Sequence, residues 1–167
     1  MTKDLATLDQ QLAEVAADVA HALVARRETI VVVESSAGGL ISSALLSQAG
    51  ASTYFLGGAV VYTAASREAL LGITLDDMQG MRSASEPYAQ LLARTARARL
   101  GAGWCLAETG AAGPSGNRYG DAAGHACLAI DGPTAVEVQT LETGSGDRAA
   151  NMRVFAITAL AMLAKAL

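Results

Sequence analysis

The stretch Thr29-Ile30-Val31-Val32-Val33-Glu34-Ser35-Ser36-Ala37-Gly38-Gly39 decides the fold class. Its β-branched apolar run predicts a buried strand over 29–33, and the helical spacing of Leu40 to Gln48 predicts a helix directly after it. The small residues in between form a turn that exposes backbone N–H groups and a serine hydroxyl at a helix N-terminus. Such a turn has the groups needed to hold an anion and to attack a carbonyl carbon.

The pattern on either side of this stretch predicts further helices and strands. The predicted helices are Leu5–Arg26, one that Thr63 caps and that ends at Leu71, one from Ser85-Glu86-Pro87 to about Leu100, and one from about Arg148 to Leu167 that Asp147 caps. The predicted strands are one that begins near Ala59, because Gly57-Gly58 weaken its start, then Trp104–Thr109, His125–Ile130 and Ala135–Glu142.

The order of these elements predicts a mixed sheet. Helices between the early strands imply parallel crossovers, whereas Gly132-Pro133 makes a hairpin turn between the last two strands. We therefore expect a three-layer α/β/α sandwich with a mixed β-sheet. Residues 1–167 are expected to form a single domain of the α/β class, since no linker or repeat divides them.

Composition narrows the function classes. The chain has 167 residues, 51% of them hydrophobic, which is enough for one substantial core. Its net charge is −4 and its arginines are scattered, so we expect no nucleic-acid partner. The start of the chain shows no apolar leader, and no apolar run reaches about 20 residues, so the expected location is cytoplasmic, away from a membrane. Cys105 and Cys127 lie in apolar runs and predict buried thiols rather than a metal site.

Three segments of small residues follow predicted strands: Ser35–Gly39, Thr109–Gly116 and Gly144–Asp147. In open α/β sheets, ligands bind beyond the carboxyl ends of the strands, where these loops are expected to meet. Free N–H groups at the start of the last helix, together with Arg148, offer a seat for a phosphate. The alternatives are that the Thr109–Gly116 segment is an ordinary turn-rich connection and that Ser35 is only a helix cap.

Five motifs in uninterrupted order carry a resemblance to a known family. They are Glu34-Ser35-Ser36-Ala37-Gly38-Gly39, then Gly58-Ala59-Val60-Val61-Tyr62-Thr63 with Leu71-Gly72-Ile73, Ala84-Ser85-Glu86-Pro87, Thr109-Gly110-Ala111-Ala112-Gly113-Pro114 and Ser145-Gly146-Asp147-Arg148. Together they resemble the C-terminal domain of the competence/damage-inducible CinA proteins. That family includes stand-alone nicotinamide-nucleotide amidases, so the resemblance implies a cofactor-free hydrolase. Such an enzyme converts nicotinamide mononucleotide to nicotinic acid mononucleotide and ammonia.

The resemblance also assigns roles to residues. It implies that Ser35 is the nucleophile, that Tyr62 lies beside it, and that Arg67 stands where the family carries a lysine base. The residues that it places around the substrate are Ser36, Ala37, Gly38, Gly39, Thr109, Gly110, Ala111, Gly113 and Arg148. Ser36 and Ala37 replace the cysteine and threonine that are usual in the family, so the departures cluster in the catalytic part of the motifs.

The arginine at position 67 is a chemical problem for an amidase. A desolvated lysine can accept a proton from serine, but a guanidinium stays protonated and has no acceptor. The only lysines are Lys3 and Lys165, at the two ends of the chain. Glu108, which precedes Thr109 at the end of a predicted strand, either pairs with Arg67 or is a solvated carboxylate at the sheet edge. His125 begins a strand and is expected to be structural, the alternative being a base near the sheet.

Two function classes therefore stay open. The first is an amidohydrolase of the nicotinamide-nucleotide type that uses Ser35 and a replacement base, with turn N–H groups around Ala37–Gly39 stabilising the oxyanion. The second is a catalytically degenerate nucleotide-binding or assembly module that keeps the loops but has lost serine activation. In both cases the expected partner is a small-molecule pyridine nucleotide, and we expect a homo-oligomer.

Overall fold

Five strands form one mixed sheet in the order β2-β1-β3-β4-β5. The computed structural model describes residues 4–167. The strands are β1 (Ile30–Glu34), β2 (Phe55–Val60), β3 (Trp104–Ala111), β4 (His125–Asp131) and β5 (Val136–Glu142). β1 pairs in parallel with β2 and β3, whereas β3–β4 and β4–β5 are antiparallel. The prediction of a mixed sheet whose last two strands form a hairpin is therefore confirmed.

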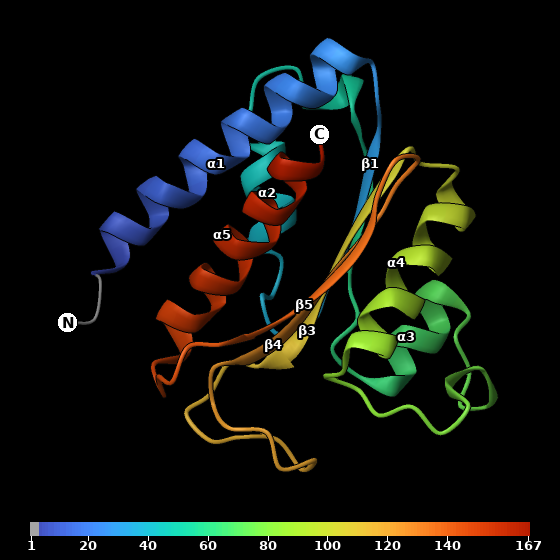
Figure 1. Ribbon diagram of the computed structural model, residues 1–167, viewed down its shortest axis with the longest axis vertical. Helices are drawn as coiled ribbons and strands as arrows, with labels where there is room; N and C mark the ends of the chain where they lie inside the picture. The colour runs from blue at the N-terminus through green and yellow to red at the C-terminus, as the bar shows by residue number, and fades with distance from the viewer. Residues whose placement is uncertain (1–3) are drawn as a thin grey trace.

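Helices cover both faces of this sheet (Figure 1). Helices α1 (Leu5–Arg26), α2 (Leu40–Leu46) and α5 (Arg148–Ala166) lie on one face, and α3 (Ala64–Leu71) and α4 (Glu86–Leu100) lie on the other. Two short 3₁₀ turns, Ala51–Thr53 and Asp76–Met78, complete the described elements. This arrangement confirms the predicted single-domain α/β/α sandwich.

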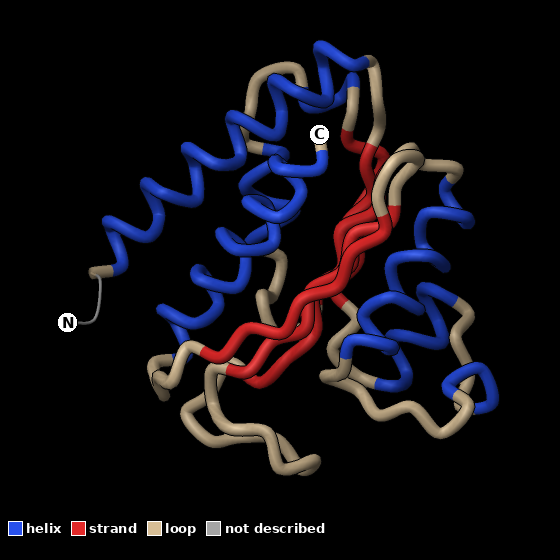
Figure 2. The backbone as a smooth tube through the Cα atoms, viewed as in Figure 1, coloured by secondary structure: helices blue, strands red, loops and turns tan. Residues whose placement is uncertain are grey.

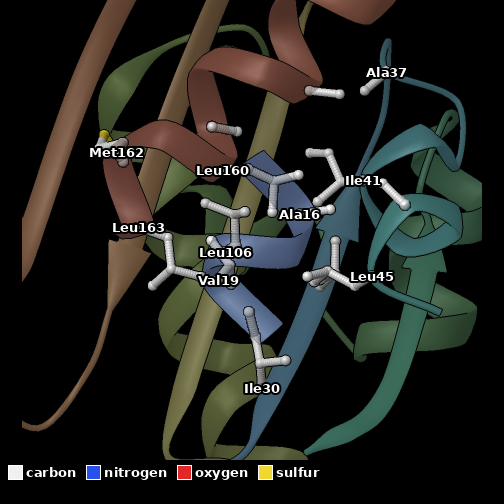
Figure 3. Close-up of a cluster of buried hydrophobic side chains, with 14 of the residues drawn as sticks. Ala16, Val19, Ile30, Ala37, Ile41, Leu45, Leu106, Leu160, Met162 and Leu163 are labelled. Atoms are coloured by element: carbon white, nitrogen blue, oxygen red, sulfur yellow. The ribbon is translucent and has the colours of Figure 1, made fainter. Parts of the chain in front are cut away.

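Each face of the sheet has its own apolar core, which we name after its main helix. In the α5-side core, Ile30 and Leu106 of the strands meet Val19 of α1, Ile41 of α2 and Leu160 of α5 (Figure 3). The α4-side core contains Val31, Val33, Cys105, Ala107 and Cys127 of the sheet, which pack with Leu71, Tyr88, Ala89 and Leu92 of the helices. Successive strand residues enter opposite cores, as the pleat requires. Both cysteines are buried free thiols, as predicted.

The predicted start of the second strand is wrong. Strand β2 begins at Phe55 rather than near Ala59, so Gly57 and Gly58 lie inside it. At Gly58 a Cβ atom would lie 2.5 Å from Ser42 Oγ, so the glycine allows helix α2 to approach the strand. The weak strand propensity of glycine is overridden here by tertiary packing.

Helix α5 is long and apolar enough, by length and composition, to cross a membrane. Within the protein, 44% of its most apolar 18-residue segment is buried. It packs against α1, α2 and the strands β3 and β4. Its buried side includes Phe155, Ala159 and Leu163. These contacts explain the apolar composition of α5 as that of a core helix.

The loops that follow β1, β3 and β5 gather at one end of the sheet, which is the lower end in Figure 2. β1 and β3 are parallel, so both of their carboxyl ends point there. β5 runs in the same direction as β3, because each is antiparallel to β4. The topology thus places the three small-residue segments of the sequence at a common edge.

Candidate functional site

Two adjoining cavities lie at this end of the sheet. The larger, which we call the arginine cavity, has a volume of about 750 Å³. Its functional lining residues are Ser35, Tyr62, Arg67, Arg82, Tyr88, Thr109, Gly110, Asn117, Arg118 and Tyr119. The structure thus brings Ser35, Tyr62 and Arg67 to one cavity.

The smaller, which we call the glycine-loop cavity, has a volume of about 230 Å³. It is lined by Ser36, Tyr62, Gly110, Ala111, Ala112, Gly113, Ser115, Gly116, Asn117 and Arg148. Tyr62, Gly110 and Asn117 line both cavities, so the two are neighbours. Five of the predicted substrate-binding residues line the glycine-loop cavity: Ser36, Gly110, Ala111, Gly113 and Arg148. Ala37, Gly38 and Gly39 line neither cavity. Thr109 faces the arginine cavity instead.

The arginine cavity has a positive wall. Three arginines line it, and none of the described residues that line it is acidic. Arg82 is paired with Asp121 at 2.5 Å, and Arg118 lies over the Tyr119 ring at 5.1 Å from its centroid. A cavity of this composition attracts anionic ligands although the whole chain is acidic.

Arg67 is buried in this wall, with 5% of its surface exposed. Its Nε donates to the carbonyl oxygen of Ile73 at 3.1 Å, and its guanidinium also contacts the Tyr88 phenol. Burial raises the pKa of Tyr88, and the contact with Arg67 opposes this shift. Helix α3 positions Arg67 through a capping box, in which Thr63 and Ser66 bond each other's backbone N–H.

Two buried carboxylates support the turn after β1. Glu34 accepts hydrogen bonds from the N–H groups of Gly39, Ile41 and Ser42 at 2.8 to 3.0 Å. Glu108 accepts from the N–H groups of Ser35 at 3.0 Å and Ala37 at 2.8 Å, and from the Ser36 hydroxyl. Burial raises the pKa of Glu108, although these three hydrogen bonds oppose the rise.

Both hypotheses for Glu108 are wrong. The residue is fully buried, so it is not a solvated carboxylate. Among the described residues 4–167, Arg67 makes no salt bridge, so the pair does not form either. The physical reason is the strand pleat: Thr109 faces the arginine cavity on the α4 side, so its neighbour Glu108 faces the α5 side.

The turn amides are already occupied within the protein. The N–H of Ala37 donates to Glu108, that of Gly39 to Glu34, and that of Gly38 to the carbonyl of Ser35. An oxyanion at this turn has to displace one of these acceptors. The N–H groups of Ala37–Gly39 are therefore not free to stabilise an oxyanion, which is the role that the sequence suggests for them.

Arg148 connects the start of α5 to the glycine-loop cavity. Its Nη1 donates to the carbonyl of Gly113 at 2.7 Å, and its Nη2 lies 3.3 Å from the Tyr62 hydroxyl. Asp147 caps α5 by accepting from the N–H of Ala150, as predicted. Within residues 4–167, the N–H groups of Gly113, Ser115 and Gly116 donate to no protein acceptor. They leave donors beside Arg148 for a phosphate.

Sequence reasoning named none of Arg82, Tyr88, Arg118 and Tyr119 as site residues. All four line the arginine cavity. Arg82 precedes α4, and Asp121 reaches it from the loop after β3, 39 positions later in the chain. In this loop, the adjacent basic and aromatic residues Arg118-Tyr119 were the one local sequence signal for a ligand-binding surface.

His125 holds the loop in front of α4. Its Nδ1 lies 2.5 Å from Glu142 Oε1, and its Nε2 lies 2.9 Å from the carbonyl of Ala84 and 3.6 Å from Asp121. Burial lowers the pKa of His125, but these acceptors outweigh burial and raise it above the ordinary value of 6.5. These contacts fit the predicted structural role. Through the carbonyl of Ala84, His125 fixes a segment that lines the arginine cavity.

This environment predicts that the free energy of unfolding falls as the pH rises above about 6.5. Below that value both folded and unfolded His125 are protonated, so the stabilisation is fully present, and it is lost as the pH rises through the folded-state pKa. Urea unfolding from about pH 6 to about pH 9 measures this. His125→Gln should flatten the decline and Glu142→Gln should reduce it. A decline of unchanged slope in His125→Gln contradicts the prediction.

Comparison with known proteins places the chain in a family. The sequence profile of the CinA C-terminal domain matches residues 12–167. The chain belongs to the CinA C-terminal domain family. A CinA-like protein of Anaeromyxobacter dehalogenans is 38% identical over 89% of the chain and 36% of the relative. One of Prochlorococcus marinus is 36% identical over 81% of the chain and 31% of the relative. The chain thus spans about a third of the length of these relatives.

Solved structures of the CinA superfamily have the same fold. A CinA superfamily protein from Klebsiella pneumoniae superposes with a TM-score of 0.86 at 27% identity, covering 92% of this chain and 96% of the other. The competence/damage inducible protein CihA from Agrobacterium tumefaciens gives a TM-score of 0.85 at 28% identity, covering 92% and 93%. The resemblance drawn from the sequence motifs is therefore confirmed at the level of family and fold.

Proposed function

We propose that this CinA-family chain is an amidohydrolase for a pyridine nucleotide, with Ser35 as the nucleophile. The observation that carries the proposal is that Ser35, Tyr62 and Arg67 line one cavity without acidic lining residues. Next to it, Arg148 and the N–H groups after Gly113 offer a phosphate seat. The arrangement suits a ligand with a flat polar ring at one end and a phosphate at the other.

In the proposed reaction, Ser35 Oγ forms a bond to the carboxamide carbon of nicotinamide mononucleotide. The C–N bond then breaks and ammonia leaves with the serine proton, after which water hydrolyses the acyl ester. Within residues 4–167, no side-chain base hydrogen-bonds to the Ser35 hydroxyl. Arg67 cannot accept the proton, so the proposal implies slow turnover in this chain.

A second candidate is a non-catalytic nucleotide-binding module. The arginine at position 67 favours it, because the guanidinium keeps a cavity attractive to anions while it removes the base. Both candidates require the same ligand, and they differ in whether ammonia is released.

Calorimetry and ammonia release test these candidates together. The intact protein is expected to bind nicotinamide mononucleotide more tightly than nicotinamide riboside, by about 10-fold or more for a charge-assisted phosphate contact. Arg148→Met should remove most of that difference. Slow ammonia release that disappears in Ser35→Ala supports the amidase. Binding without any release supports the module, and equal affinity for the two ligands overturns the phosphate seat and with it the nucleotide proposal.

A further inference from the structure

The guanidinium of Arg67 is a buried charge without a counter-ion. Only 5% of the residue is exposed, and its protein partners are the neutral Ile73 carbonyl and the neutral Tyr88 phenol. In the described part of the chain no carboxylate lies within 4.0 Å of it. A buried charge without a compensating partner is unfavourable, so an anion in the cavity would stabilise this guanidinium.

The other arginines of the cavity wall already have their partners. Arg82 pairs with Asp121 and lies over the Tyr119 ring. Arg118 also lies over that ring and donates to its hydroxyl. The comparable half-buried Arg97, in the last turn of α4, is also paired, with Asp131 at 2.6 Å. Arg67 therefore differs from all three arginines: among the described residues, no carboxylate pairs with its guanidinium and no aromatic ring stacks on it.

The cavity determines where an anion bound to Arg67 would lie. Arg67 lines the arginine cavity together with Ser35 and Thr109, on the α4 side of the sheet. The phosphate seat at Arg148 belongs to the neighbouring glycine-loop cavity, which Arg67 does not line. An anion at Arg67 is thus a second negative group of the ligand, at the end opposite its phosphate.

We propose that Arg67 binds a carboxylate of the ligand, so that the site holds the acid form of the pyridine nucleotide more tightly than the carboxamide form. This inference rests on the proposed function for the nucleotide. A carboxylate presents acceptors to the guanidinium and neutralises its charge. A carboxamide presents one acceptor and an NH₂ group, whose donors face the donors of the arginine. If the chain turns over, its acid product is therefore retained and inhibits it.

Calorimetry with nicotinic acid mononucleotide and nicotinamide mononucleotide tests this preference. The wild type is expected to bind the acid about 10- to 100-fold more tightly, as for a charge-assisted pair compared with a neutral one. Arg67→Met should bring the ratio close to one. Arg94→Met, which removes an exposed arginine of α4 that lines neither cavity, should keep the ratio. Arg67→Gln replaces the methionine variant if that variant does not fold.

The outcomes separate the inference from the proposed function. Equal affinity for the two nucleotides, or a preference that survives in Arg67→Met, overturns the inference and leaves the nucleotide proposal intact. Titration with free nicotinate, followed by NMR, covers the case in which neither nucleotide binds. Nicotinate binding that depends on Arg67 then supports the carboxylate site while the nucleotide proposal fails, and the absence of nicotinate binding overturns both.

Discussion

Glu34→Gln is expected to lower the free energy of unfolding by about 2–4 kcal/mol, whereas Glu108→Gln is expected to lower it by less than about 1 kcal/mol. Both residues are fully buried glutamates that accept three hydrogen bonds each. The difference comes from the partners. Both oxygens of Glu34 accept from backbone N–H groups, so one of them becomes an NH₂ group that faces a fixed donor.

In Glu108→Gln, the glutamine can be oriented so that its NH₂ group does not face a backbone N–H donor. Oε2 alone receives both backbone N–H groups, while Oε1 receives the Ser36 hydroxyl. A glutamine can turn its NH₂ group toward Ser36, whose hydroxyl rotates to accept. Burial also raises the pKa of Glu108, which lowers the cost of replacing it by a neutral side chain. Urea unfolding of the two variants, with Glu108→Leu as the variant that removes all acceptors, measures the contrast. Equal losses at the two positions contradict it.

Arg67→Lys is expected to raise the rate of ammonia release from nicotinamide mononucleotide, by at least about 10-fold and by up to about 10²–10⁴-fold for a well-placed general base. Arg67 is buried, and no described carboxylate lies close enough to hold a new ammonium in its charged form. Burial without an acid partner lowers the pKa of a lysine, so part of it is neutral near pH 7 and accepts the Ser35 proton. A colorimetric ammonia assay on matched protein concentrations measures the rate.

Three controls make this result specific. Ser35→Ala in the Arg67→Lys background should abolish the gain, whereas Ser36→Ala should keep most of it, because Ser36 donates to Glu108. Arg118→Lys adds a lysine to the same cavity and should give no gain. Glu108 lies on the other face of the sheet, so no compensating change is needed there. A wild type that turns over rapidly, and that Arg67→Lys slows, would show that Arg67 binds the substrate beside another base.

Local patterns of the sequence were enough for most of the fold. Apolar spacing located α1 with its observed ends Leu5–Arg26, and the caps Thr63, Ser85 and Asp147 all mark real helix starts. The helical connections between the early strands and the short turn between the last two strands predicted the mixed sheet correctly. The start of β2 could not be predicted this way, because β2 includes Gly58, where a Cβ atom would collide with Ser42 of α2. Propensity carries no information about such a packing contact.

Only the site residues that lie at or just beyond strand ends could be predicted from the sequence. The motifs indicated that Ser35, Tyr62 and Arg67 meet, and the topology brings them to one cavity. The partner of Glu108 was not predictable from type and position alone. Opposite charges suggested a pair with Arg67, but the pleat sends adjacent residues to opposite faces. Asp121, which pairs with Arg82, reaches the wall from a long loop whose path has no periodic pattern.

The alternation at Glu108 and Thr109 has a consequence for the electrostatic potential at the end of the sheet. It puts the carboxylates of Glu34 and Glu108 behind the Ser35–Gly39 turn and the guanidinium of Arg67 in front of it. The turn therefore lies in a field that runs from the arginine side to the glutamate side, through a region of low polarisability. A dipolar ligand group in the arginine cavity is oriented by this field, with its negative end toward Arg67. The same field opposes the formation of negative charge on the glutamate side of the turn.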